Sequence, residues 1–499
     1  MKIHHLFSEE KMRNGKWKRF FSLCLLVSLI TSCIDGYKGN ETWSSSVKDT
    51  QLESPAADQI TVTFAETLQG YKQTIGWPLV PGAGGYLVSI YNVDDPENPF
   101  VIGEENQIVD GVSVQRDATE DTRYKVVIKT LGNPKNNNAE ALTASEKTYD
   151  NMLPVTAVIP DGTNLTDYFT DNPIPDSTTE LCYELEAGGS YTMSGNVLQG
   201  MTPVTIRGDK VDHPKITMTD GSFVNDGTGF ALKFIDMDYS NFAGASSNAV
   251  ILMNSTFNTA GMPLTVSGHL VIPTTSPVVL QSCKITGLKY YLFYDNGQKY
   301  AIGSFLIKDC IIGQNTGSFG NALIRFATGV VKDFTVTNST IYNEVAPSNS
   351  SNRFMQISAN GNVADVKPAM ETWTNGNMTV TNCTFWQAGK TAQSFNSNGP
   401  MGNTTDKVTI QNNVFVDSYE NGRIISRFRR GNTAAIFTGG QNSQWYEGQL
   451  FTGSQDVTAD VAYFTTDPKL TYLGNGEFKM EGAEQITART GDPRWLPAQ

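Results

Sequence analysis

The sequence predicts an all-β chain in which a β-sandwich is followed by a right-handed parallel β-helix. Two observations carry this prediction. A short β-type phrase recurs at spacings of roughly 30 residues through the second part of the chain, which is typical of solenoids that bury a continuous core by stacking their repeats. Helical periodicity is nearly absent, while Thr, Val, Asn and Gly are abundant.

The repeated phrase has two alternating apolar residues, a polar turn residue, and another apolar residue three positions after the turn. Clear copies are Val336–Ile341 and Val380–Phe385. Period two places alternate side chains on one face of a strand, and Asn tolerates the left-handed backbone of a tight bend. We therefore expect Asn338, Asn382 and Asn412 to stack in one column, about 4.8 Å apart per coil.

Turn residues are predicted at positions 208, 236, 254, 282, 309, 338, 382 and 412. The interval from Asp236 to Asn254 is too short for a complete coil, so one of these two assignments is open.

Composition excludes some classes of partner and site. The 499 residues carry a net charge of −13 and are 39% hydrophobic, enough for a large core in two domains. Nucleic-acid binding needs a basic face, so no nucleic-acid partner is expected.

Cys283, Cys310 and Cys383 directly follow turn residues, where buried free thiols are expected. No Cys-x-x-Cys pair has the spacing of a zinc site, and neither a metal nor a cofactor is predicted.

Residues 1–33 have the pattern of a secretory signal. A basic stretch precedes the apolar run Phe20–Leu29, which is shorter than the roughly 20 residues that span a bilayer. The small residues before Cys33 resemble a bacterial lipobox, which implies that Cys33 is lipidated; plain secretion is the alternative. Residues 34–54 lack periodicity and are predicted to be a tether.

Residues 55–150 contain short strand-like runs separated by Pro, Gly, Asp and Asn, which predicts a β-sandwich. Trp77 on the second run and Tyr124–Ile128 on a late run resemble a fibronectin type III domain. The resemblance implies that Trp77 lies in the core and that Tyr124 makes a corner. A spacer role is favoured for this domain, with ligand binding as the alternative.

Residues 151–499 are predicted to form the β-helix. Glu184–Met193 and Val204–Gly208 resemble the opening coil of pectate-lyase-like β-helices, a group that includes lyases, hydrolases and esterases. The Gly-His-Gly and Arg-Ile-Lys elements of polygalacturonase-type hydrolases are absent from the sequence. No carboxylate pair recurs on one outer strand face, although glycoside hydrolysis normally needs one. No catalytic residue is assigned, and the enzyme question stays open, with a non-catalytic protein favoured.

Candidate ligand-binding residues lie late in the chain. Period two places Arg423, Arg427 and Arg429 on one strand face, where guanidinium groups suit the carboxylates of uronic acids. The alternative is that they pair with acidic residues of adjacent coils. Trp386 follows inward Phe385 and so points outward, and Trp373 lies in an insertion. Both are candidate platforms for sugar stacking.

The order of these parts, with the ending Gly491–Leu496, resembles a group of uncharacterised outer-membrane lipoproteins. Their genes lie beside starch-utilisation-system-like transporter genes of Gram-negative glycan degraders. The resemblance implies a lipid-anchored, surface-exposed protein of the outer membrane, a polysaccharide ligand, and a glycan transporter complex as a partner. We favour binding of a pectin-like or other acidic glycan without catalysis. A polysaccharide lyase or glycoside hydrolase is the alternative, and a structural or adhesive surface protein is the third hypothesis.

Overall fold

The structure is a computed structural model that describes residues 47–256, 263–358, 366, 372–390, 395–396, 401, 405–419, 436–450 and 464–498. The chain divides into two compact units between Met152 and Leu153. Strands dominate both units, which confirms the predicted all-β class. Among the described residues, no helix is long and apolar enough to cross a membrane.

The first unit has two antiparallel sheets. One contains β1 (Thr61–Thr67), β2 (Gly70–Gly76) and β6 (Ser113–Asp117); the other contains β3 (Tyr86–Asn92), β4 (Phe100–Val101), β5 (Gln107–Val109), β7 (Arg123–Thr130) and β8 (Ser145–Asp150). Buried Ile75, Trp77, Tyr86 and Tyr124 belong to one core cluster drawn from both sheets. The Tyr124 hydroxyl donates to the Thr119 carbonyl at 2.8 Å and accepts from the Thr119 N–H at 2.7 Å. The aromatic groups thus join the sheets, while the fibronectin resemblance stays a prediction.

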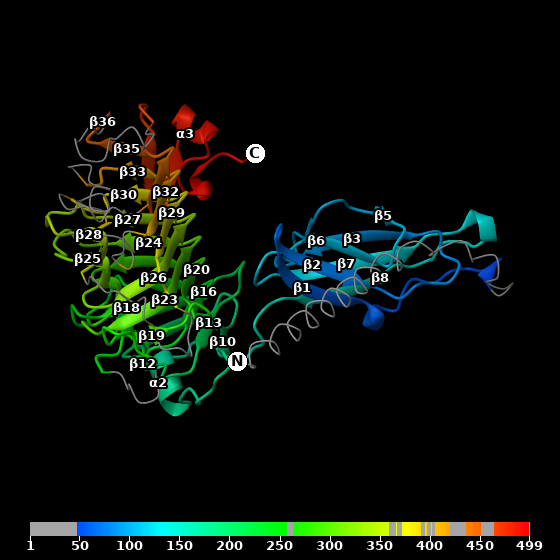
Figure 1. Cartoon of the computed structure of the whole chain (residues 1–499), viewed down its shortest axis with the longest axis horizontal. Coiled ribbons are helices and arrows are strands. Elements are labelled where there is room, and N and C mark those ends of the chain that lie inside the picture. Colours follow the sequence, from blue (N-terminus) through cyan, green and yellow to red (C-terminus); the bar gives the residue numbers. More distant parts are fainter. Residues whose placement is uncertain are drawn as a thin grey trace, which may run out of the picture. The chain divides into compact units, whose positions relative to one another are not determined.

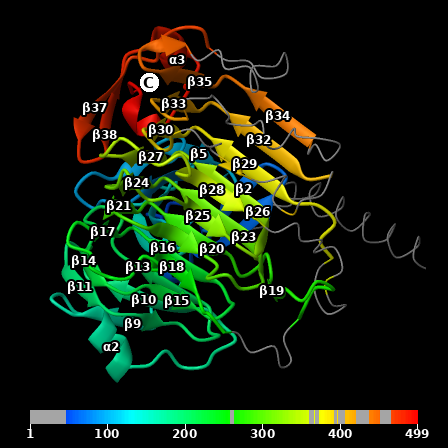
Figure 2. The same cartoon turned by 90° about the vertical axis from the view of Figure 1, so that its left-hand side faces the viewer.

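The second unit is a parallel β-helix with three sheets (Figure 1). The first sheet contains β9 (Ala157–Ile159), β10 (Leu181–Leu185), β13 (Val204–Arg207), β16 (Phe230–Lys233), β20 (Val278–Gln281), β23 (Tyr300–Lys308), β26 (Val330–Thr337), β29 (Asn377–Thr381), β32 (Lys407–Gln411) and β34 (Ile436–Gly440), with β19 (Leu270–Ile272) beside β23. Figure 2 shows these strands running side by side along the solenoid. The predicted β-helix is confirmed.

The second and third sheets complete each coil. The second contains β11 (Ser190–Ser194), β14 (Lys215–Asp220), β17 (Asp236–Asp238), β21 (Lys284–Leu288), β24 (Ile311–Gln314), β27 (Thr340–Asn343), β30 (Thr384–Trp386), β33 (Val414–Val416), β35 (Ser443–Tyr446) and β36 (Gln449–Leu450). The third contains β12 (Val197–Leu198), β15 (Phe223–Asn225), β18 (Ala249–Met253), β22 (Tyr291–Tyr294), β25 (Ala322–Phe326), β28 (Arg353–Ile357) and β31 (Phe395–Asn396). Helix α2 (Leu165–Asp171) buries Leu165 and Phe169 in the same core as the first coils.

One column of left-handed residues joins the first sheet to the second. Its members have φ between 50° and 58°: Phe234, Ser282, Asp309, Asn338, Asn382, Asn412 and Gln441. The Asn382 side-chain amide donates to the Asn338 side-chain oxygen at 3.3 Å, and Asn338 donates in turn to Asp309 at 3.1 Å. Backbone N–H groups of the column also donate to the next coil, for example Asn338 to Thr381. The predicted stacking of Asn338, Asn382 and Asn412 is therefore confirmed.

Two predicted turn positions are wrong. Arg207 pairs with Lys233, so the residue in register with Gly208 is Phe234 and not Asp236. Asp236 begins β17 in the second sheet, and Asn254 follows β18 in the third. Because the turn in this coil is a buried phenylalanine, it lacks the polar signal that marks the other turns. The long interval from Phe234 to Ser282 carries the insertion that contains β19.

The residue after each turn points into the core. This inner column contains Cys283, Cys310, Ser339, Cys383 and Asn413, all buried. Cys310 donates its N–H to the Ser339 hydroxyl at 3.0 Å, and Cys383 donates to the Asn413 side chain at 3.0 Å. The four cysteines of the described residues are free and buried, as expected for the solenoid thiols. Burial raises the pKa of the Cys383 thiol, which keeps it protonated and unreactive.

Residues 464–498, here called the C-terminal cover, pack on the outside of the second sheet. They include β37 (Leu470–Gly474), β38 (Glu477–Met480), α3 (Ala483–Thr487) and the 3₁₀ turn Pro493–Trp495. Fully buried Asp492 accepts from the Thr340 hydroxyl at 2.7 Å, and the Arg494 guanidinium donates to the carbonyls of Asp309 and Cys310. The cover thus binds directly beside the turn column.

The turn column predicts a specific response to mutation at Asn382. Asn382→Ala is expected to lower the free energy of unfolding by about 1–2 kcal/mol, because a Cβ-bearing residue without a local hydrogen bond adopts left-handed backbone at that cost. Asn382→Gly keeps the backbone conformation and should lose less. Denaturant unfolding of both variants checks this order. Equal losses in the two variants would contradict a conformational role for the column.

Candidate binding groove

The predicted ligand residues do not form a described site. Arg423, Arg427 and Arg429 lie outside the described residues, as does Cys33. Trp373 is fully buried in the β-helix core and has no ring face open to a ligand.

Trp386 points outward from β30, as the alternation indicated, but the C-terminal cover occupies that side. Its ring stacks on Tyr472 with centroids 4.6 Å apart and lies 5.9 Å from the Phe478 ring. Trp386, Trp445 and Trp495 pack together with buried Val414 and Val416. This outward aromatic therefore holds the cover in place in the structure.

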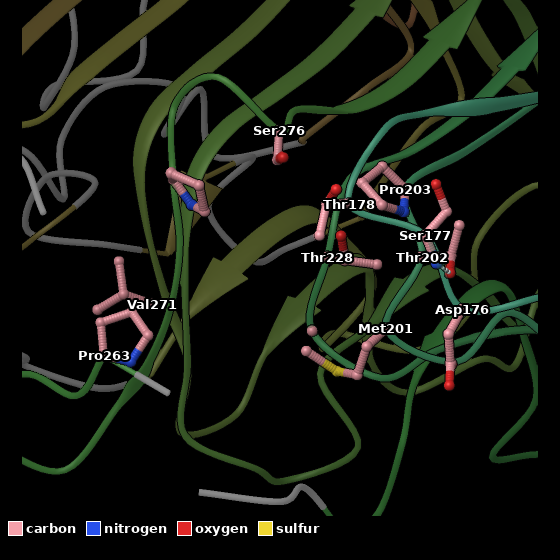
Figure 3. A pocket seen from close by; sticks show the side chains of 12 residues that line it. Asp176, Ser177, Thr178, Met201, Thr202, Pro203, Thr228, Pro263, Val271 and Ser276 are labelled. Atoms are coloured by element: carbon pink, nitrogen blue, oxygen red, sulfur yellow. Dashed lines mark hydrogen bonds between the residues drawn. The ribbon is translucent and has the colours of Figure 1, made fainter. Parts of the chain in front are cut away.

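A different site lies where loops lead from the third sheet into the first. A cavity of about 840 Å³ has two unlike walls (Figure 3). One wall carries the hydroxyls of Ser177, Thr178, Thr202 and Thr228, with Asp176 and Met201 beside them. The facing wall is apolar and contains Pro263 and Val271, while Ser276 lies between the two on the loop before β20.

The hydroxyl wall is held by a chain of hydrogen bonds. The Thr202 hydroxyl, almost fully buried, donates to the Pro175 carbonyl at 2.7 Å and accepts from the Ser177 N–H at 2.9 Å. The Ser177 hydroxyl donates to the Thr179 carbonyl at 2.7 Å. The Gln199 side chain donates to the carbonyls of Thr202 and Gly229, which joins two successive coils. The buried contacts of Thr202 and Gln199 fix the wall before any ligand binds.

A second cavity of about 350 Å³ continues over the outer face of the first sheet. It shares Thr178, Pro203 and Ser276 with the first, so the two form one groove, here called the corner groove. The second part adds Glu180, whose carboxylate accepts from the Thr205 hydroxyl at 2.5 Å, and Lys233. Among the described residues, the charged groups that line the corner groove are the carboxylates of Asp176 and Glu180 and the ammonium of Lys233.

The chemistry of the corner groove suits binding. Neither histidine nor arginine is among the described residues that line it. No group of three or more His, Cys, Asp or Glu within the described ranges has the arrangement of a metal site. Hydroxyl groups supply both donors and acceptors, and the proline and valine surfaces offer apolar contact. A flexible polar ligand with apolar C–H faces fits these two walls.

The sequence pattern did not reveal this groove. Its residues come mainly from Asp176–Thr178, Met201–Pro203 and the insertion before β20. The first two segments precede the first copy of the repeated phrase, and the insertion interrupts the repeat. The misassigned turns at Asp236 and Asn254 also hid the length of that insertion. A search for Ser, Thr and Pro grouped just before each first-sheet strand would have found part of it, since loops on a solenoid edge commonly carry binding residues.

Comparisons with known proteins found two family models and a solved structure. Residues 1–188 match a family model, DUF4992, described as a domain of unknown function, and residues 189–344 match a second, DUF4957, with the same description. No curated protein matches the sequence. A solved structure, pectate lyase PelI from Erwinia chrysanthemi in complex with tetragalacturonic acid, matches at 10% identity, covering 57% of this chain and 86% of that chain. Its TM-score is 0.15, which supports no argument about the site.

The hydrogen bonds of Thr202 generate a prediction about the groove wall. Thr202→Val removes a buried hydroxyl that serves as donor and acceptor, and should lower the free energy of unfolding by about 1–3 kcal/mol. Thr178→Val, on an exposed side chain of the same wall, is the matched control and should change stability little. Thermal unfolding of both variants measures the difference. A Thr202→Val protein as stable as the control would contradict the proposed hydrogen-bonded wall.

Proposed function

We propose that this protein is a lipid-anchored surface protein that binds polysaccharide in the corner groove without chemical turnover. The observation that carries the proposal is the pairing of a hydroxyl wall with an apolar wall in one groove. A pyranose or furanose ring presents hydroxyls at its edge and C–H groups on its faces, so it can satisfy both walls at once. Mostly pre-formed clefts with a few fixed polar groups are typical of small-molecule sites.

The groove supports binding more than catalysis. Glycoside hydrolysis usually places two carboxyl groups on either side of the scissile bond, one of them kept protonated. Asp176 and Glu180 both have exposed side chains, and Glu180 already accepts a hydrogen bond from Thr205.

The charges of the groove favour neutral sugar units. Two carboxylates and one ammonium give a weakly negative surface, which does not attract uronate groups. A pectin-like polysaccharide with neutral side chains fits this groove. The preference for acidic units rests on Arg423, Arg427 and Arg429, and remains a proposal.

Blocking the corner groove should weaken the binding of neutral polysaccharide. Ser276→Trp places an indole between the two walls and is expected to reduce retention on the bound polysaccharide at least tenfold, or about 1.4 kcal/mol. Affinity electrophoresis in gels containing the neutral polysaccharides arabinan or galactan measures this loss. Ser247→Trp, on an exposed loop of the same solenoid away from the groove, is the control and should bind as the unaltered protein does. Binding that persists in Ser276→Trp would place the ligand elsewhere.

Anchoring is proposed to depend on Cys33. Cys33→Ala removes the thiol that carries the lipid, and the protein should then leave the outer-membrane fraction for the soluble fraction. Stable anchoring needs two or more acyl chains, and Cys33 is the residue proposed to carry them. Its loss should therefore release the protein from the membrane completely. Membrane fractionation of cells grown with labelled fatty acid measures both the loss of the lipid and the release of the protein. Unchanged partitioning of the variant would refute lipidation at this position.

A further inference from the structure

A further cavity lies at the turn column and has a different chemical character from the corner groove. It has a volume of about 530 Å³ and lies between the loop that follows β13 and the C-terminal cover. The described residues that line it include His213 and the charged side chains of Lys210, Asp236, Lys284, Asp309, Asp492 and Arg494. This cavity, here called the charged cavity, shares no lining residue with the corner groove.

Most charges of the charged cavity are already paired. The Arg494 guanidinium contacts the Asp492 carboxylate and donates to the carbonyls of Asp309, Cys310 and Asn338, which uses its donors on the protein itself. The Asp309 carboxylate accepts from the Asn338 side chain at 3.1 Å. These residues form the wall of the cavity and leave little capacity for a ligand.

Lys284 is different from its neighbours. It begins β21 in a column of the second sheet that also holds Lys215 and Asp236. Lys215 forms an ion pair with Asp238 at 3.1 Å, and Asp236 contacts His213. Within the described part of the chain, no acidic residue pairs with Lys284. Lys284 lines the cavity, and its ammonium group, a donor of three hydrogen bonds, forms no ion pair with the Asp residues around it.

His213 supplies a complementary group. Its Nδ1 lies 2.9 Å from the Asp236 carboxylate. Because a carboxylate only accepts hydrogen bonds, Nδ1 carries the proton, and in the neutral ring Nε2 keeps its lone pair. Asp236 thus fixes both the tautomer and the ring orientation. Lys284, which carries an ammonium donor, and His213, which has an acceptor at Nε2 when the ring is neutral, both line the charged cavity.

We propose that the charged cavity is a second ligand site that takes a hydroxy acid of the uronic acid class. The carboxylate of the ligand would bind the Lys284 ammonium, and a ring hydroxyl would donate to Nε2 of His213. The choice of a uronic acid as the ligand rests on the proposed polysaccharide function. The site and its contacts are independent of the corner groove. It gives the protein separate positions for neutral and acidic sugar units.

The test uses galacturonate as the probe, with galactose as the neutral analogue, in calorimetric titrations of the full chain at low salt. Galacturonate should bind and galactose should not. Lys284→Gln and His213→Ala are each expected to weaken binding at least tenfold, while Lys284→Arg retains most of it. Lys215→Gln, in the same column but paired with Asp238, is the matched control and should bind normally. Added salt should weaken binding, since exposed charges are screened over about 10 Å at 0.1 M.

Each result decides between the two sites. No galacturonate binding, or equal binding by the Lys284→Gln and Lys215→Gln proteins, overturns the proposal for the charged cavity and leaves the corner groove unaffected. Loss of binding in folded Lys284→Gln protein, with circular dichroism unchanged, supports it. If galacturonate binds through Lys284 but no polysaccharide is retained by the corner groove, the second site stands and the proposed function fails.

Discussion

The β-helix depends on one constraint, a left-handed bend at the same register position in successive coils. Each turn residue directs the chain from the first sheet into the second, and its backbone N–H donates to the following coil. A change of register by one residue would move every inward side chain to the outside. The bend therefore determines which side chains enter the core, including the small buried column of Cys283, Cys310, Ser339 and Cys383.

The same bend determines where ligands can reach the solenoid. The C-terminal cover occupies the second sheet beside β27 and β30, where Trp386 and Thr340 contact it. The corner groove lies before the first-sheet strands, and the charged cavity lies at the turn column, between the loop after β13 and the C-terminal cover. Both are bounded by loops or by the cover, while the rigid coils hold them in position, as is usual for binding sites on solenoids.

The sequence predicted the architecture because the repeat is a local signal. Asn338, Asn382 and Asn412 are polar residues that tolerate left-handed backbone, so the sequence alone indicated the column. Phe234 performs the same bend without a polar side chain, and the prediction failed there.

The sites could not be predicted in the same way. Trp386 was correctly placed on the outer face, but its contact with Tyr472 joins residues far apart in the sequence. Thr178, Thr202 and Ser276 come together in the corner groove because the coils stack on one another. The repeat within a single coil does not indicate which residues of different coils will meet.

The most direct test of the central claim, binding without turnover, is to incubate the purified protein with pectin, arabinan and galactan and to measure retention and product release together. The account predicts retention of at least one polysaccharide, with no new reducing ends and no unsaturated uronate product after prolonged incubation. Release of either product, abolished by substitution of a single Asp or Arg, would contradict it and make the protein an enzyme.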